Sequence, residues 1–224
     1  MTKNDLAAAT ALATRCLALV AAAKAGQAAG QSGAQLAYLT GLLTANAASE
    51  LAAGTFWADF AKCFEAARAA GATIVQMETI RVAMAAAQPT TPVAVAVQNF
   101  AIRLALVEEA QILAATVFVS RADADAALAA ISPAFDAAIE TAANNFDQVA
   151  YQALVALEGA VATDLSTRAF ALPTIVNYGF ARNLPALWIA QSLYQDASRA
   201  DELVAENDVV HPLFMPRQIE ALSS

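Results

Sequence analysis

The sequence predicts a mainly α protein, with a helical bundle over residues 1–171 and a small α+β module over residues 172–224. Alanine, a strong helix former, accounts for much of the 59% of residues that are hydrophobic. Apolar side chains recur at helical spacing throughout residues 1–171. The remaining stretch changes to a strand–helix–helix–strand order, and its roughly fifty residues are near the lower limit for a self-standing core.

The bundle is expected to contain roughly seven helical segments joined by short connections. A glycine-rich stretch at 26–33 indicates a turn or a frayed helix, and Gly54 and Gly71 are expected to end helices. Pro92 suits the first turn of a long helix, whereas Pro133 is expected to interrupt one near its middle. The expected helices cover residues 4–24, 34–53, 55–70, 73–87, 92–119, 120–143 (with the interruption) and 146–170.

Two features of the bundle leave alternatives open. Phe56, Trp57, Phe60 and Phe64 follow helical spacing and form a ridge that faces either the core or a partner. The charged fraction is only 14%, below the usual quarter or so. A long helical chain with so few charges has too little polar surface to cover itself, which predicts that other subunits of a homo-oligomer cover some helix faces. The alternative is that alanine enrichment only reflects a genome rich in G and C.

The charge balance argues against nucleic acid as a partner. The net charge is −8, and the twelve basic residues are scattered with no cluster that could contact phosphates. The N-terminal segment lacks a signal-peptide pattern, and charged or amide side chains interrupt the apolar windows. We therefore expect no membrane insertion and synthesis in the cytoplasm.

Few residues suggest chemistry, and no enzyme, cofactor or metal site is expected. His211 is the single histidine, so the sequence has no multi-histidine metal site. Cys16 and Cys63 are expected to be small buried side chains, although a disulfide would form if their helices were adjacent. The acidic pair Glu108 and Glu109 is interpreted as a solvated helix face rather than a glycosidase acid pair.

The elements of the C-terminal module follow from local signals. Residues 174–178 are β-branched or aromatic and predict a strand. A first helix over about 187–194 precedes a second one, which Asp196 or Ser198 caps and which ends at Asn207, a residue that tolerates left-handed geometry. Prolines then exclude helix, and residues 219–222 predict a terminal strand.

This order of strands and helices resembles a LysM module. The amino-acid sequence of the segment is similar to the C-terminal end of the Mu-like phage "DNA circularisation" family, whose members belong to contractile-tail baseplates. The similarity rests on Leu-Pro-Ala-Leu at 184–187, Leu-Tyr at 193–194, Asp-Ala-Ser-Arg-Ala-Asp-Glu-Leu at 196–203, Asn207 and His-Pro-Leu-Phe at 211–214. The chain departs from the family at Gln195, where glycine is usual, and at 217–218, which replace a longer glycine-rich turn. Residues 1–171 predict helices, whereas members of the family normally open with a β-rich domain.

The resemblance implies a structural protein of a phage or prophage tail, assembled in the host cytoplasm and located in the virion. Its expected partners are tail tube, hub or wedge proteins, together with further copies of the chain in a ring. The alternative is a LysM-type module that binds peptidoglycan. Residues in or beside the module are the candidates for a protein interface: Arg182, Trp188, Tyr194, Asn207, His211 and the apolar knob Leu213, Phe214 and Met215.

Overall fold

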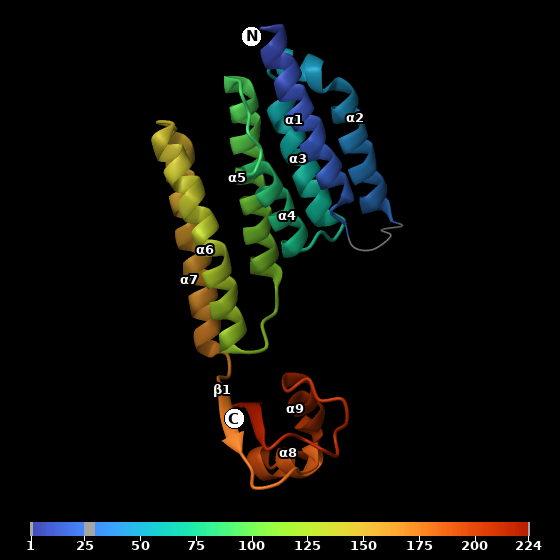
Figure 1. Cartoon of the computed structure of the whole chain (residues 1–224), viewed down its shortest axis with the longest axis vertical. Helices are drawn as coiled ribbons and strands as arrows, with labels where there is room; N and C mark the ends of the chain where they lie inside the picture. The colour runs from blue at the N-terminus through green and yellow to red at the C-terminus, as the bar shows by residue number, and fades with distance from the viewer. Residues whose placement is uncertain (1, 25–29, 224) are drawn as a thin grey trace. The chain divides into compact units, whose positions relative to one another are not determined.

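A computed structural model describes residues 2–24 and 30–223, and it is mainly helical, as predicted, with one small two-stranded sheet (Figure 1). The chain divides into two compact units. The helical unit comprises Met1–Thr116 and Ala130–Val161, and the C-terminal unit comprises Val117–Ala129 and Ala162–Ser224. Two long helices, α6 (Arg121–Asn144) and α7 (Gln148–Ala171), contribute to both units.

Five helices form most of the helical unit: α1 (Lys3–Ala22), α2 (Gln31–Ala53), α3 (Phe56–Ala69), α4 (Ile74–Ala85) and α5 (Pro92–Ala115). Helix α1 packs against α2 and α5, while α2 packs against α3 and α4 against α5. Thr2 and Thr73 begin α1 and α4 with reciprocal capping boxes. Gly54 and Gly71 adopt positive φ angles of 79° and 84° after α2 and α3, as expected. The predicted turn at 26–33 lies partly outside the described residues.

The core of the helical unit is built on α3. The side chains of Phe56, Phe60 and Phe64 are fully buried, so the aromatic ridge faces the core. Their neighbouring helices contribute small side chains, which let helices approach closely. Cys16 and Cys63 are buried free thiols, as predicted, and burial raises the pKa of each to about 12. Such thiols are unreactive at neutral pH.

Helix α6 corrects one sequence expectation, because it runs without interruption through Pro133. Proline removes one hydrogen bond from a helix interior, which costs about 3 kcal/mol. The buried residues Ile131, Phe135 and Ala142 give α6 tertiary packing on both sides of the proline. We attribute the continuity of the helix to this packing. In α7, Leu154 and Val161 are buried, whereas Val149 is exposed.

The C-terminal unit contains the predicted strand–helix–helix–strand order. Strand β1 (Ile175–Gly179) pairs antiparallel with β2 (Gln218–Leu222), and α8 (Ala186–Tyr194), the short 3-10 turn η1 (Ala197–Arg199) and α9 (Ala200–Glu206) lie between them in sequence. Gln195, which stands where the resembled family has glycine, adopts a left-handed φ of 57°. The core of this unit contains Ala186, Ile189, Ala190, Leu203, Met215, Ile219 and Ala221.

Among the residues that the structure describes, helices α1 and α6 are long and apolar enough to cross a membrane by length and composition alone. Each also buries residues inside the protein, among them Leu17 in α1 and Phe135 in α6. The core helix of a protein without a membrane passes the same test.

Candidate protein interface

Four large apolar side chains are exposed on one part of the C-terminal unit. Leu187 and Trp188 in α8 are 60% and 52% exposed, and Leu213 and Phe214 in the following loop are 53% and 66% exposed. We call these four residues the apolar cluster. Exposed side chains of this size, gathered rather than scattered, are typical of a surface that binds a partner.

Backbone hydrogen bonds bring the two halves of the apolar cluster together. The N–H of Ala186 donates to the Pro212 carbonyl over 2.7 Å, and the N–H of Met215 donates to the Leu184 carbonyl over 3.1 Å. Loop residues 211–215 are therefore fastened to the first turn of α8. The ring of His211 lies 5.6 Å from that of Phe214, and the ring of Phe180 lies 6.4 Å from that of Trp188.

Met215 corrects the prediction that residues 213–215 form one exposed knob. Its side chain is fully buried in the core of the C-terminal unit. The hydrogen bond from Met215 to Leu184 draws this residue under α8, so that Leu213 and Phe214 alone project outward. Met215 thereby anchors the loop and lowers the entropy that a partner's binding would cost.

Two other candidate residues are engaged within the chain. The guanidinium of Arg199 lies over the Tyr194 ring, with 3.7 Å from Cζ to the ring centroid. Asn207 donates from Nδ2 to the carbonyls of Leu203 and Glu220 and accepts from the N–H of Glu220. The sequence predicts left-handed geometry at Asn207, but Asn207 has a φ of −101°. The left-handed residue after α9 is instead Asp208, with a φ of 48°.

We expect Asn207→Ala to destabilise the C-terminal unit by about 2 kcal/mol, because three hydrogen bonds of about 0.5–1.5 kcal/mol each are lost. Hydrogen exchange at the Glu220 amide, which donates to Asn207 over 2.7 Å, should speed up in the variant. Asn183→Ala is the matched control, since Asn183 is exposed and its side chain makes no hydrogen bond to any described residue. Equal protection in both variants would contradict this role.

Arg182 and Arg217 supply positive charge near the apolar cluster. Both are exposed, and neither forms an ion pair with a described residue. The N–H of Phe180 donates to the Arg217 carbonyl over 2.7 Å, so the loop carrying Arg182 lies next to Arg217. The ring of Phe180 in turn contacts Trp188. An apolar surface with unpaired arginines beside it suits a partner that carries carboxylates around an apolar hollow.

The helical unit contains buried charges that the sequence did not reveal. Glu108 and Glu109 are each 2% exposed, which overturns their interpretation as a solvated face. Arg68 of α3 binds Glu108, and Arg81 of α4 binds Glu109 over 3.0 Å. Burial raises the pKa of both carboxyl groups, and the arginines partly oppose that rise. The two arginines lie far from the glutamates in sequence, so no local pattern identifies the pairs.

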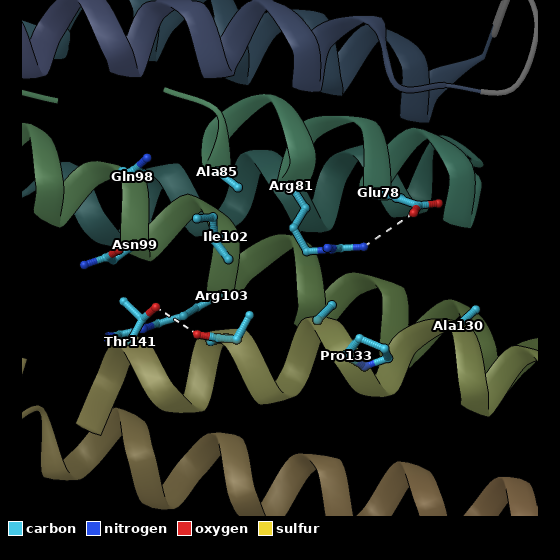
Figure 2. A pocket seen from close by; sticks show the side chains of 13 residues that line it. Glu78, Arg81, Ala85, Gln98, Asn99, Ile102, Arg103, Ala130, Pro133 and Thr141 are labelled. Carbon is cyan, nitrogen blue, oxygen red and sulfur yellow. Dashed lines mark hydrogen bonds and ion pairs between the residues drawn. The ribbon is translucent and has the colours of Figure 1, made fainter. Parts of the chain in front are cut away.

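An open cleft of about 520 Å³ lies between α4, α5 and α6 in the helical unit (Figure 2). Pro133 and the alanines of α6 form one wall, and Arg81 and Arg103 contribute charge from the other side. Both guanidiniums are already paired, Arg81 with Glu109 and Glu78, and Arg103 with Asp147 over 2.7 Å. The part of the chain that the structure describes contains no group of three or more metal-binding side chains. The cleft therefore presents no distinctive ligand chemistry.

A scan against models of known protein families gives no match for this chain, and a search of curated proteins finds no similar sequence either. Among the features of the chain, the apolar cluster with its adjacent arginines is the most specific surface.

Proposed function

We propose that the protein is a structural component of a phage-type contractile tail baseplate, and that its C-terminal module joins it to tube, hub or wedge subunits. The observation that carries the docking role is the apolar cluster, whose four large side chains are each more than half exposed. The assignment to a tail rests on the resemblance over residues 184–214. We also propose that the C-terminal module is LysM-like.

The energetics of the apolar cluster support protein binding. Aromatic residues at the centre of an interface often contribute 2 kcal/mol or more each, roughly thirtyfold in affinity. Trp188 and Phe214 are the aromatic members of the cluster. The buried Met215 and the hydrogen bonds at Ala186 hold the loop in place before binding, so little ordering is needed.

The composition of the helical unit supports assembly in several copies. Exposed apolar side chains such as Tyr38, Leu42 and Val75 occur on α2 and α4. Only 14% of all residues are charged, so these helices offer neighbours a weakly solvated surface. We propose that further copies in a ring cover part of it, within a virion assembled in the host cytoplasm.

The test is co-purification with tail proteins encoded in the same gene cluster. We expect Trp188→Ala and Phe214→Ala each to weaken retention at least about tenfold, because each removes a central aromatic anchor. Phe146→Ala is the matched control, since Phe146 is an exposed aromatic residue that belongs neither to the apolar cluster nor to the faces of α2 and α4. Retention that all three variants share with the unmodified protein would exclude the apolar cluster as the docking surface.

A second candidate, peptidoglycan binding, is favoured by the exposed aromatic rings beside the loops at 179–183 and 210–215, because sugars stack on such rings. Purified peptidoglycan as the ligand distinguishes the two functions, because the docking role alone predicts no retention on it. Retention on purified peptidoglycan that is lost in Trp188→Ala and Phe214→Ala would favour glycan binding. No retention of the unmodified protein would reject it.

A further inference from the structure

The two outer edges of the small sheet differ in how many of their backbone N–H and C=O groups form hydrogen bonds. The flanking hydrogen bonds, from Ser223 N–H to Thr174 O and from Phe180 N–H to Arg217 O, fix which residues of β1 face β2. Even-numbered residues of β1 direct their backbone groups toward β2, because the pattern alternates along an antiparallel pair. Ile175, Asn177 and Gly179 therefore direct their N–H and C=O groups away from the sheet.

The outer edge of β2 is closed at its centre. Glu220 lies opposite Asn177 in the register, so its backbone groups also point outward, away from β1. The Asn207 side chain forms a hydrogen bond with both the N–H and the C=O group of Glu220, each 2.7 Å long. The outer edge of β1 has no such cover, since the outward groups of Ile175, Asn177 and Gly179 have no hydrogen-bond partner among the described residues.

The uncovered edge continues into an incompletely buried face. Val176 and Tyr178 lie opposite Ala221 and Ile219, so they share the face of the sheet that packs on the core. Ala221 and Ile219 are buried, whereas Val176 and Tyr178 are each 36% exposed. Another strand added beside β1 would cover these side chains and satisfy the free backbone groups together.

The sequence of β1 is complementary to itself in a two-fold antiparallel arrangement centred on Asn177. In that register Ile175 lies opposite Gly179, and Val176 lies opposite Tyr178, which is a favourable β-branched and aromatic pair. The strand, Ile-Val-Asn-Tyr-Gly, contains no charge, so no like charges face each other across the axis. A side chain opposite Gly179 meets open space, since no atom lies within 4 Å of a Cβ position there.

We propose that β1 is a dimerisation edge, at which two copies of this chain pair β1 with β1 to form one four-stranded sheet. Each of the three outward-facing pairs then exchanges two backbone hydrogen bonds. This contact goes beyond the proposed baseplate role and uses no residue of the apolar cluster, which stays free for another protein.

Light scattering on the full chain tests the proposal through its mass. The unmodified protein and Asn177→Thr should have twice the 23.1 kDa monomer mass at micromolar concentration, whereas Asn177→Pro should have the monomer mass. Proline removes the central outward N–H but no hydrogen bond to β2. Trp188→Ala should remain dimeric, which separates this contact from the docking role. A monomeric unmodified protein, or a dimer that persists in Asn177→Pro, overturns the proposal.

Cross-linking provides a readout that does not depend on how proline affects folding. Across the two-fold axis the Cα atoms of residue 177 would lie about 5.5 Å apart, a separation that a disulfide spans. Mild oxidation should link Asn177→Cys into a dimer, with no background from the buried Cys16 and Cys63. Glu220→Cys is the matched control, since this exposed residue neighbours Asn177 on the covered edge and should give no dimer. Equal cross-linking of both variants, or of neither, overturns the proposal.

Discussion

Phe60→Ala should lower the free energy of unfolding of the helical unit by about 3–5 kcal/mol, the usual range for removing a buried phenylalanine. The ring is fully buried, and its centroid lies 4.8 Å from that of Phe56 and 5.4 Å from that of Phe64. A third ring, that of Phe100 on α5, lies 6.3 Å away. Alanine would leave a cavity that these neighbouring rings, fixed on two helices, cannot fill.

Urea denaturation followed by far-ultraviolet circular dichroism measures this loss. Tyr38→Ala is the control, because its side chain is 66% exposed and its removal should change stability by no more than about 0.5 kcal/mol. If Phe60→Ala cost no more than this control, α3 would not be the centre of the core.

Arg81→Met should destabilise the helical unit by about 3–5 kcal/mol at neutral pH, because it leaves the buried Glu109 carboxylate without its counter-charge. The Glu109 side chain is 2% exposed and that of Arg81 is 16% exposed, so water replaces little of the lost interaction. Lys62→Met removes one partner of a comparable but exposed pair with Asp59, and it should cost less than about 1 kcal/mol.

The loss in Arg81→Met should depend on pH with a definite sign. Burial raises the pKa of Glu109 in the folded state, and Arg81 opposes this rise. Without Arg81 the folded-state pKa rises further above the unfolded value. The variant should therefore be most destabilised above that raised pKa and should recover as the pH falls through it, because protonated Glu109 needs no counter-charge.

The double variant Arg81→Met with Glu109→Leu removes both charges and should recover most of the lost stability. Denaturation at several pH values measures the single and double variants together. A destabilisation of Arg81→Met that does not change with pH, or a double variant as unstable as the single one, would contradict this account.

Much of the fold could be predicted because its signals are local. Gly54, Gly71 and Pro92 mark helix limits through their own backbone restrictions, and the order of the C-terminal elements follows from short stretches of sequence. Pro133 is the instructive exception. Its local effect would interrupt α6, but packing of the residues on either side outweighs it, and no local rule includes that packing.

The features that could not be predicted depend on partners distant in the sequence. Glu108 and Glu109 have an acidic pattern typical of a solvated face, and only the positions of Arg68 and Arg81 explain their burial. One signal was available: buried Ala105 and Leu113 continue the apolar spacing on both sides of the glutamates. Met215 was misplaced for a similar reason, since its burial follows from the backbone contact with Leu184.

The two hydrogen bonds between the Asn207 side chain and the Glu220 backbone also limit how far the sheet can be extended. A sheet with two open edges can propagate from molecule to molecule into a fibre, because each addition exposes a new template. Here the side chain of Asn207 occupies the outward backbone groups of Glu220 at the midpoint of β2, so growth would stop after the proposed pairing of β1 with β1. With β1 paired as proposed, the side chain of Asn207 would keep the resulting four-stranded sheet from adding further strands at the centre of β2.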